Sequence, residues 1–147
     1  YNYTLKELYM KKILFISLSL LSLFSFVLSE NGDFGVVPMV SATWDNNIGF
    51  NYGVGLALGK WGEGVFSGVY TSYSYSKKGN NLSFGPYAGI GLATFRIGVN
   101  RLKLKENDQE YWGIETSPSM FMGHLRLGIL KDNDRPKLSY ALGLGIF

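Results

Sequence analysis

The sequence predicts an all-β protein: a closed antiparallel up-and-down transmembrane β-barrel of about eight strands, preceded by a cleavable signal peptide. Three observations predict it. Apolar and small residues alternate with period two through most of residues 30–147, and no stretch there repeats its apolar residues with the period of a helix. Polar segments interrupt this alternation at short intervals. The second face of the strands is small rather than charged, which is unlike the solvent face of a soluble sheet.

The N-terminal part of the chain is expected to lie outside the barrel. Residues 10–29 (MKKILFISLSLLSLFSFVLS) begin with a basic pair, continue with an apolar run broken only by serines and end in small residues, as a secretory signal peptide does. The apolar run is shorter than the roughly 20 residues that a spanning helix needs. Residues 1–9 precede the first methionine and are interpreted as a mis-called upstream extension. Residues 30–147 then form one barrel domain.

The charge of the chain argues against nucleic-acid binding, and its lack of cysteine bears on the source of its stability. The formal net charge of +3 falls to +1 when Lys6, Glu7, Lys11 and Lys12 are left out with the leader, so there is no electrostatic basis for binding nucleic acid. The chain has no cysteine, and an exported domain of this size often relies on disulfides. Its stability must therefore come from another source, which a closed barrel embedded in lipid would supply.

Eight segments alternate clearly enough to be expected as strands. They cover residues 36–44, 50–59, 65–76, 82–92, from 94 onward, 111–116, 121–130 and 138–146. The clearest is 50–59, where one face is apolar and the other is almost entirely glycine and alanine. Eight strands form a barrel whose interior is just wide enough for side chains to fill, which explains the small inward residues.

The expected connections are of two kinds that alternate along the chain. The first, third, fifth and seventh are strongly polar, whereas the others are tighter, near residues 61–63, 92–94 and 117–119. Aromatic residues gather near both sets of strand ends. On the polar side they are Trp44, Tyr73, Tyr75 and Trp112, and on the tight side Trp61, Phe66, Phe95 and Phe121. An even strand count with short turns at one end and two aromatic girdles is typical of outer-membrane barrels.

With its signal peptide, alternating strands and final segment LSYALGLGIF (138–147), the chain resembles the small eight-stranded outer-membrane β-barrel proteins of diderm, Gram-negative-type bacteria. The resemblance implies an outer-membrane location, contact with outer-membrane lipid, a monomer, and recognition of an aromatic C-terminal signal by the barrel-assembly machinery. Tyr140 and Phe147 resemble that signal. Phe147 departs from the family pattern, because it falls in phase with Gly143 and Gly145 rather than with the lipid-facing residues.

Four ionisable residues fall at inward positions of the expected strands: Arg96, Glu115, His124 and Arg126. A charge in a narrow lumen needs a partner. Neighbouring strands are expected to bring Glu115 towards Arg96 on one side and towards His124 or Arg126 on the other. We interpret the four as a structural polar network that plugs the lumen, with a gate or a proton-linked site as the alternative.

The sequence predicts no catalytic, cofactor-binding or metal-binding residues. His124 is the only histidine, and the Ser117–Ser119 segment is expected at the opposite end of its hairpin, too far away to form a nucleophile–base pair. The expected role is therefore structural or surface-interacting, without catalysis. The alternatives are a secreted soluble β-barrel that binds an apolar ligand, a narrow pore, and a barrel enzyme that modifies lipid A.

Overall fold

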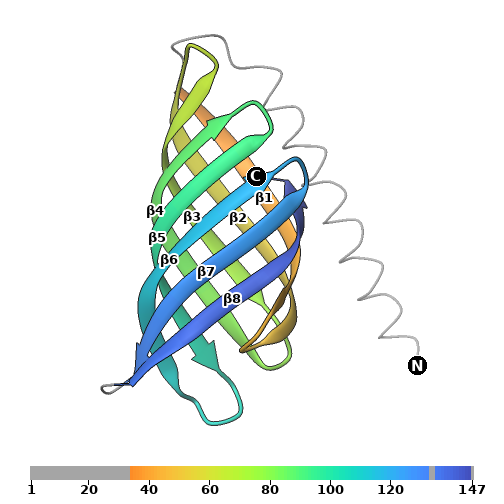
Figure 1. Ribbon diagram of the computed structural model, residues 1–147, viewed down its shortest axis with the longest axis vertical. Helices are drawn as coiled ribbons and strands as arrows, with labels where there is room; N and C mark the ends of the chain where they lie inside the picture. The colour runs from red at the N-terminus through yellow and green to blue at the C-terminus, as the bar shows by residue number, and fades with distance from the viewer. Residues whose placement is uncertain (1–33, 133–134, 147) are drawn as a thin grey trace, which may run out of the picture.

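The computed structural model describes residues 34–132 and 135–146, which form an eight-stranded barrel (Figure 1). The expected signal peptide, the upstream extension and Phe147 lie outside the described residues. The strands are β1 (Phe34–Asp45), β2 (Gly49–Gly62), β3 (Val65–Tyr75), β4 (Gly79–Ile90), β5 (Ala93–Leu104), β6 (Glu110–Met120), β7 (Gly123–Asp132) and β8 (Arg135–Ile146). Within the described part of the chain, no helix is long and apolar enough to cross a membrane.

Every strand pairs antiparallel with the next in sequence, and β8 returns to β1. The closing seam is the shortest: β1 uses residues 40–45 there, opposite residues 141–146, whereas it pairs with β2 along its whole length. Closure leaves no strand at an open edge of the sheet over these paired stretches. The prediction of an all-β, closed, eight-stranded up-and-down barrel is confirmed.

The two ends of the barrel differ in their connections, as expected. One end, hereafter the turn end, has two-residue connections at 63–64, 91–92 and 121–122. Each contains a residue with positive φ, namely Glu63 and Gly64, Gly91, and Phe121, as tight hairpin turns require. The other end, hereafter the loop end, carries the longer connections 46–48, 76–78 and 105–109. The ends lie at opposite extremes of the long axis in Figure 1.

The prediction of a turn at residues 117–119 is wrong. β6 continues through this segment to Met120, and the chain reverses at Phe121 and Met122. Pro118 is tolerated because its outward side chain is exposed and the register of β6 with β7 is interrupted there, between Thr116 and Ser119. A proline lacks the N–H of a ladder bond, so it suits a strand only at such an interruption.

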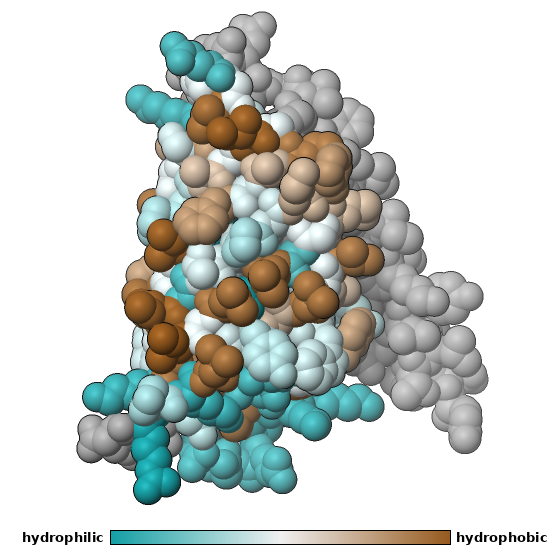
Figure 2. All heavy atoms as spheres, viewed as in Figure 1, coloured by the Kyte–Doolittle hydropathy of each residue, from teal (hydrophilic) through white to brown (hydrophobic). Residues whose placement is uncertain are grey.

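The two faces of the barrel have opposite chemistry. Outward apolar side chains are exposed, for example Ile114 and Leu142, both at 64%. Inward polar side chains are buried, for example Asn51 at 0% and Asn100 at 1%. Figure 2 shows apolar side chains spread over the outer wall and hydrophilic ones gathered below them at the loop end. The exception is β1, where residues 38–41 are buried on both faces.

Candidate functional site: a charged cluster in the lumen

Two apolar clusters fill the lumen near its ends. The turn-end cluster is built of Met39, Ala57, Phe66, Tyr70 and Tyr87, with Val37 and Trp61 packed against it. The expectation that Trp61 and Phe66 belong to an outer aromatic girdle is therefore wrong, because Phe66 is buried in the lumen and Trp61 packs against it. The loop-end cluster is built of Ile48, Leu102 and Leu130, with Leu104 and Tyr111 packed against it. Charged side chains from β1, β5, β6 and β7 lie between the two, because they contact members of both.

One part of this charged cluster is centred on Arg126. Its Nη2 donates to Asp45 Oδ2, and its Nε lies 3.7 Å from Glu115 Oε2. Asp45, Glu115 and Arg126 are all buried, and the Asp45 side chain is 0% exposed. One buried guanidinium therefore lies between two buried carboxylates from different strands, and its single charge balances one of the two. Asp45 Oδ1 also accepts the backbone N–H of Ile48, which joins this part to the loop-end cluster.

Glu115 has two further partners that orient its carboxylate. Asn100 Nδ2 donates to Oε2 at 2.7 Å, and the Tyr70 hydroxyl donates to Oε1 at 3.4 Å. The Arg96 guanidinium lies over the Tyr70 ring, 5.3 Å from its centroid. The expected approach of Glu115 to Arg96 is thus mediated by Tyr70, which contacts both. Such cation–π contacts are stabilising when water is excluded.

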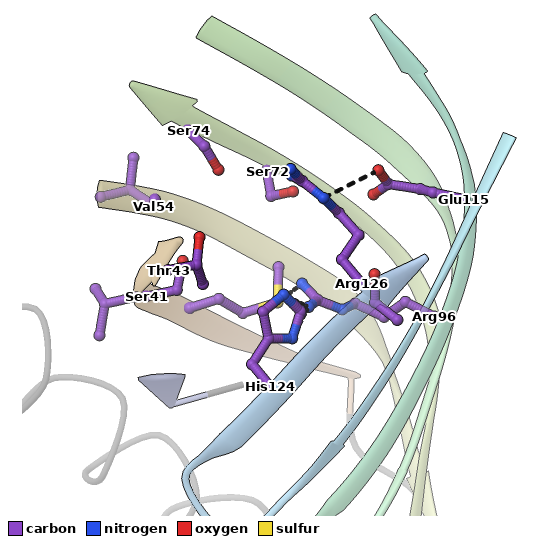
Figure 3. A pocket seen from close by; sticks show the side chains of 13 residues that line it. Ser41, Thr43, Val54, Ser72, Ser74, Arg96, Glu115, His124 and Arg126 are labelled. Carbon is purple, nitrogen blue, oxygen red and sulfur yellow. Dashed lines mark hydrogen bonds and ion pairs between the residues drawn. The ribbon is translucent and has the colours of Figure 1, made fainter. Parts of the chain in front are cut away.

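The second part of the cluster is centred on His124. Arg96 Nη2 lies 3.1 Å and Ser119 Oγ 2.9 Å from His124 Nδ1 (Figure 3 draws the Arg96 contact). The expectation that Ser119 lies far from His124 is wrong. The physical reason is the misplaced turn: because β6 continues past Pro118, Ser119 becomes the direct register partner of His124 across the short hairpin.

Hydrogen-bond chemistry fixes the role of this histidine. A guanidinium can only donate, and Arg96 Nη2 lies 3.1 Å from Nδ1 and 3.5 Å from Nε2, so a ring nitrogen accepts from Arg96. The direction of the Ser119 contact follows the tautomer of the ring. A general base must take up the proton of its nucleophile, and the positive charge that the ring then gains would face the Arg96 guanidinium. The geometry therefore describes an anchored histidine rather than an activated serine.

The space beside these residues is small. A cavity of about 20 Å³ lies among Ser41, Thr43, Ser72, Ser74 and the charged cluster (Figure 3). That volume has room for about one water molecule. Within residues 34–132 and 135–146, no group of three histidine, cysteine or acidic residues is arranged to hold a metal ion. The cluster can accordingly hold charges and a water, but has no room for an organic substrate.

All four residues expected in the lumen are buried there, with relative exposures of 4–6%. The structure pairs Arg96 with His124 and Glu115 with Arg126. The predicted first strand ends at residue 44, which places Asp45 in the first polar connection. The structure instead places Asp45 at the end of β1, buried in the lumen. The missed signal is positional: Ser41, Thr43 and Asp45 share one strand face, and all three are buried.

The expected C-terminal signal is only partly described. Tyr140 lies on the outward face of β8, 40% exposed, with its ring centroid 6.1 Å from that of Trp44 on the neighbouring β1. Phe147, the other residue of the expected signal, lies outside the described residues, so its phase stays a prediction. Recognition by the assembly machinery also stays a prediction.

Comparisons of the chain with protein-family models, curated proteins and solved structures give no match. The functional argument therefore rests on the chemistry of the barrel itself.

Replacing Ser119 with alanine is expected to lower the free energy of unfolding by about 1 kcal/mol, the usual net contribution of one hydrogen bond. His124 keeps its contact with Arg96, so the effect is moderate. Urea unfolding of the purified protein measures the change. The matched control is Ser67→Ala, at an exposed position of β3, for which we expect no change. Equal stability of the Ser119 variant and wild type would contradict a stabilising Ser119–His124 bond.

Proposed function

We propose that this protein is a small integral outer-membrane β-barrel with a packed, non-conducting lumen and a structural or surface role. The observation that carries the proposal is the distribution of polarity described above, with large apolar side chains exposed outside and polar ones buried inside. This arrangement is the reverse of a soluble barrel, and it suits a solvent of lipid. The apolar alternation of the sequence and its expected signal peptide support the same assignment.

The two ends support an orientation in the membrane. Outer-membrane barrels have short turns on the periplasmic side and longer loops outside. The turn end then faces the periplasm and the loop end faces the exterior. The short loops leave little surface for an extended adhesive or receptor function.

The filled lumen supports a role without transport or catalysis. Apolar clusters occupy both ends, and the charges between them compensate one another, because the two guanidiniums of Arg96 and Arg126 share the cluster with the two carboxylates of Asp45 and Glu115. Ser119 is buried, and the cavity lined by His124 has room for about one water molecule. We infer no cofactor and no nucleic-acid partner; the expected partners are outer-membrane lipid and, during biogenesis, the assembly machinery, with the barrel as a monomer.

The test is to express the chain from Met10 in a diderm bacterium, separate the envelope fractions, and run the protein on a gel with and without boiling. We expect an outer-membrane protein whose folded and boiled forms migrate differently, since a closed barrel resists detergent until heated. Recovery from the periplasm without detergent would overturn the proposal and favour a soluble barrel with an apolar ligand. Ion conductance through the protein in planar bilayers would overturn the part of the proposal that describes the lumen as packed and non-conducting.

A further inference from the structure

The turns at the turn end of the barrel differ in chemistry. The β2–β3 turn is formed by Glu63 and Gly64, and Lys60 is exposed on the outward face of β2 beside it. The β6–β7 turn is formed by Phe121 and Met122, which are 65% and 58% exposed. Exposed apolar side chains continue from this turn onto the neighbouring strands and turn, namely Ile90, Leu92, Met120 and Leu144. A continuous apolar surface of this kind indicates contact with something other than water.

The register of the strands explains how turns at one end of the barrel can meet different surroundings. One row of directly paired residues passes through every strand and includes the residue on each side of each turn. The row consists of Gly62, Val65, Ile90, Ala93, Met120, Gly123, Leu144 and Ala42. From Ala42 it returns to β2 at Tyr52, ten residues from Gly62 and nearer the loop end. The strands are therefore tilted against the barrel axis, and the row moves towards the loop end with each strand.

This tilt sets the β6–β7 turn well below the β2–β3 turn. Neighbouring strands about 4.8 Å apart and tilted by about 40° shift the row by roughly 3 Å per strand along the axis, which gives about 12 Å between the two turns. Figure 1 shows the same order, with the β2–β3 turn at the top, the β4–β5 turn below it and the β6–β7 turn lower again. Lys60 precedes Gly62 by two residues, which correspond to only about 5 Å of height. The β6–β7 turn thus lies further inside than Lys60, level with the exposed apolar residues Leu56 and Leu58 of β2.

The backbone of the β6–β7 turn suits an environment without water. The N–H of Phe121 donates to the carbonyl oxygen of Leu92 at 2.9 Å, and the carbonyl oxygen of Met122 accepts from the N–H of Gly145 at 2.8 Å. The first bond joins this turn to the β4–β5 turn, and the second joins it to β8. Backbone groups in lipid must be paired within the protein, and these lateral bonds supply partners that an isolated hairpin turn would find in water.

The backbone angle of Phe121 gives an independent reason for an apolar side chain here. Its φ of 55° lies in the left-handed region, which glycine and asparagine adopt more readily than a bulky residue. Glu63 holds the equivalent position of the β2–β3 turn, with a φ of 51°. A phenylalanine at such a position costs conformational energy, which an aqueous turn would not return. Removing the ring from water offsets this cost.

We propose that the β6–β7 turn, with Phe121 and Met122, is embedded among the acyl chains of the membrane leaflet nearer the turn end. This inference rests on the membrane location proposed above. Lys60 and Glu63, on the opposite side of the barrel, reach the headgroups and water, so the apolar belt ends at different strand positions around the barrel. The aromatic girdle expected from the sequence would place Phe121 at the interface with water, whereas the register places the whole turn deeper.

The test measures the surroundings of single labelled positions. The chain has no cysteine, so one introduced cysteine carrying a nitroxide spin label reports on one position. Met120→Cys and Met122→Cys are compared with Gly62→Cys in vesicles of phosphatidylethanolamine and phosphatidylglycerol. Gly62 is the matched control, because it precedes the β2–β3 turn as Met120 precedes the β6–β7 turn, and a Cβ there meets nothing within 4 Å. Leu127→Cys, in the exposed apolar wall, is the reference for lipid.

Electron paramagnetic resonance measures how often each label collides with oxygen, which concentrates in lipid, and with a nickel chelate, which stays in water. We expect the ratio of oxygen to nickel collisions at Met120 and Met122 to approach that at Leu127 and to exceed that at Gly62 several-fold. Equal, water-like ratios at Met122 and Gly62 would overturn the proposal. Low accessibility to both reagents at Met122 would also overturn it, because a second copy or another protein would then cover the turn.

Replacing the strained residue gives a second test, in which water and lipid predict opposite signs. Phe121→Asn favours the observed φ but removes the ring, so it should raise the urea midpoint of unfolding if the turn lies in water and lower it if the turn lies in lipid. We expect a lower midpoint in the same vesicles. Glu63→Asn, at the equivalent position of the β2–β3 turn, is the control and should not lower the midpoint. An unchanged or higher midpoint for Phe121→Asn would contradict an embedded turn.

The label in the wall separates this inference from the function on which it rests. A lipid-like ratio at Leu127 together with a water-like ratio at Met122 overturns the embedded turn alone. A water-like ratio at Leu127 overturns both.

Discussion

Replacing Arg126 with methionine is expected to lower the free energy of unfolding by about 3–5 kcal/mol, the range for removing one partner of a buried ion pair. Methionine keeps the unbranched stem of the arginine side chain but ends where the guanidinium begins, and it carries no charge. Asp45 and Glu115 would then remain buried without the guanidinium that faces both. Tyr70 and Asn100 still donate to Glu115, so the larger penalty is expected at Asp45. Urea unfolding in lipid vesicles measures the change.

Charge removal provides the control for this prediction. In the double variant Asp45→Asn, Arg126→Met one cation and one anion are removed together, and Glu115 stays with Arg96 through Tyr70. Most of the lost stability should return, because no buried charge is left without a counter-charge. The single variant Glu115→Gln should fall between, since Arg126 keeps Asp45, and its membrane fractionation should not change. If the Arg126→Met variant unfolds like wild type, or if the double variant Asp45→Asn, Arg126→Met is less stable than Arg126→Met alone, the ion-pair interpretation is wrong.

Much of the barrel could be predicted from the sequence because its strands alternate with a period of two between an apolar outward face and a small or polar inward face. The alternation predicted the strands and the inward positions of Arg96, Glu115, His124 and Arg126. It predicted the strand bounds less well where polar residues continue a strand towards the loop end, as Asp45 does. A polar residue near a strand end can belong to a loop or to the lumen, and only the parity of the preceding residues distinguishes them.

Pairings within the lumen were less predictable than positions. The segment 117–119 contains a proline and two serines, which is typical of a turn. Local composition does not reveal that the hydrogen-bond ladder between β6 and β7 is interrupted there, which allows a proline inside the strand. Because the turn was misplaced, the partner of His124 was missed. The contact between Arg126 and Asp45 joins β7 to β1, which are not adjacent in the sheet. Such a contact depends on barrel curvature and side-chain reach, neither of which a sequence pattern specifies.

The second large effect is expected from filling the space between two glycines. Replacing Gly59 with valine should lower the free energy of unfolding by about 3 kcal/mol or more, the upper range for overpacking. Gly59 on β2 faces Gly68 on β3 in the register. A Cβ at Gly59 would lie 2.8 Å from Gly68 Cα and closer still to the backbone carbonyl group of Ser67. Backbone atoms cannot turn aside as a side chain can, so the two strands must separate.

A second glycine of the same strand provides the matched control. A Cβ at Gly62, at the turn end of β2, would meet nothing within 4 Å, and Gly62→Val is expected to change stability by less than about 0.5 kcal/mol, as surface substitutions usually do. The measurement is urea unfolding in vesicles, together with the fraction of unboiled protein that migrates as a folded band. Similar losses for both variants would assign the effect to β2 composition rather than to close strand approach. Strongly reduced folding of the Gly59 variant alone would show that the tight curvature of this small barrel depends on the absence of side chains where β2 and β3 meet.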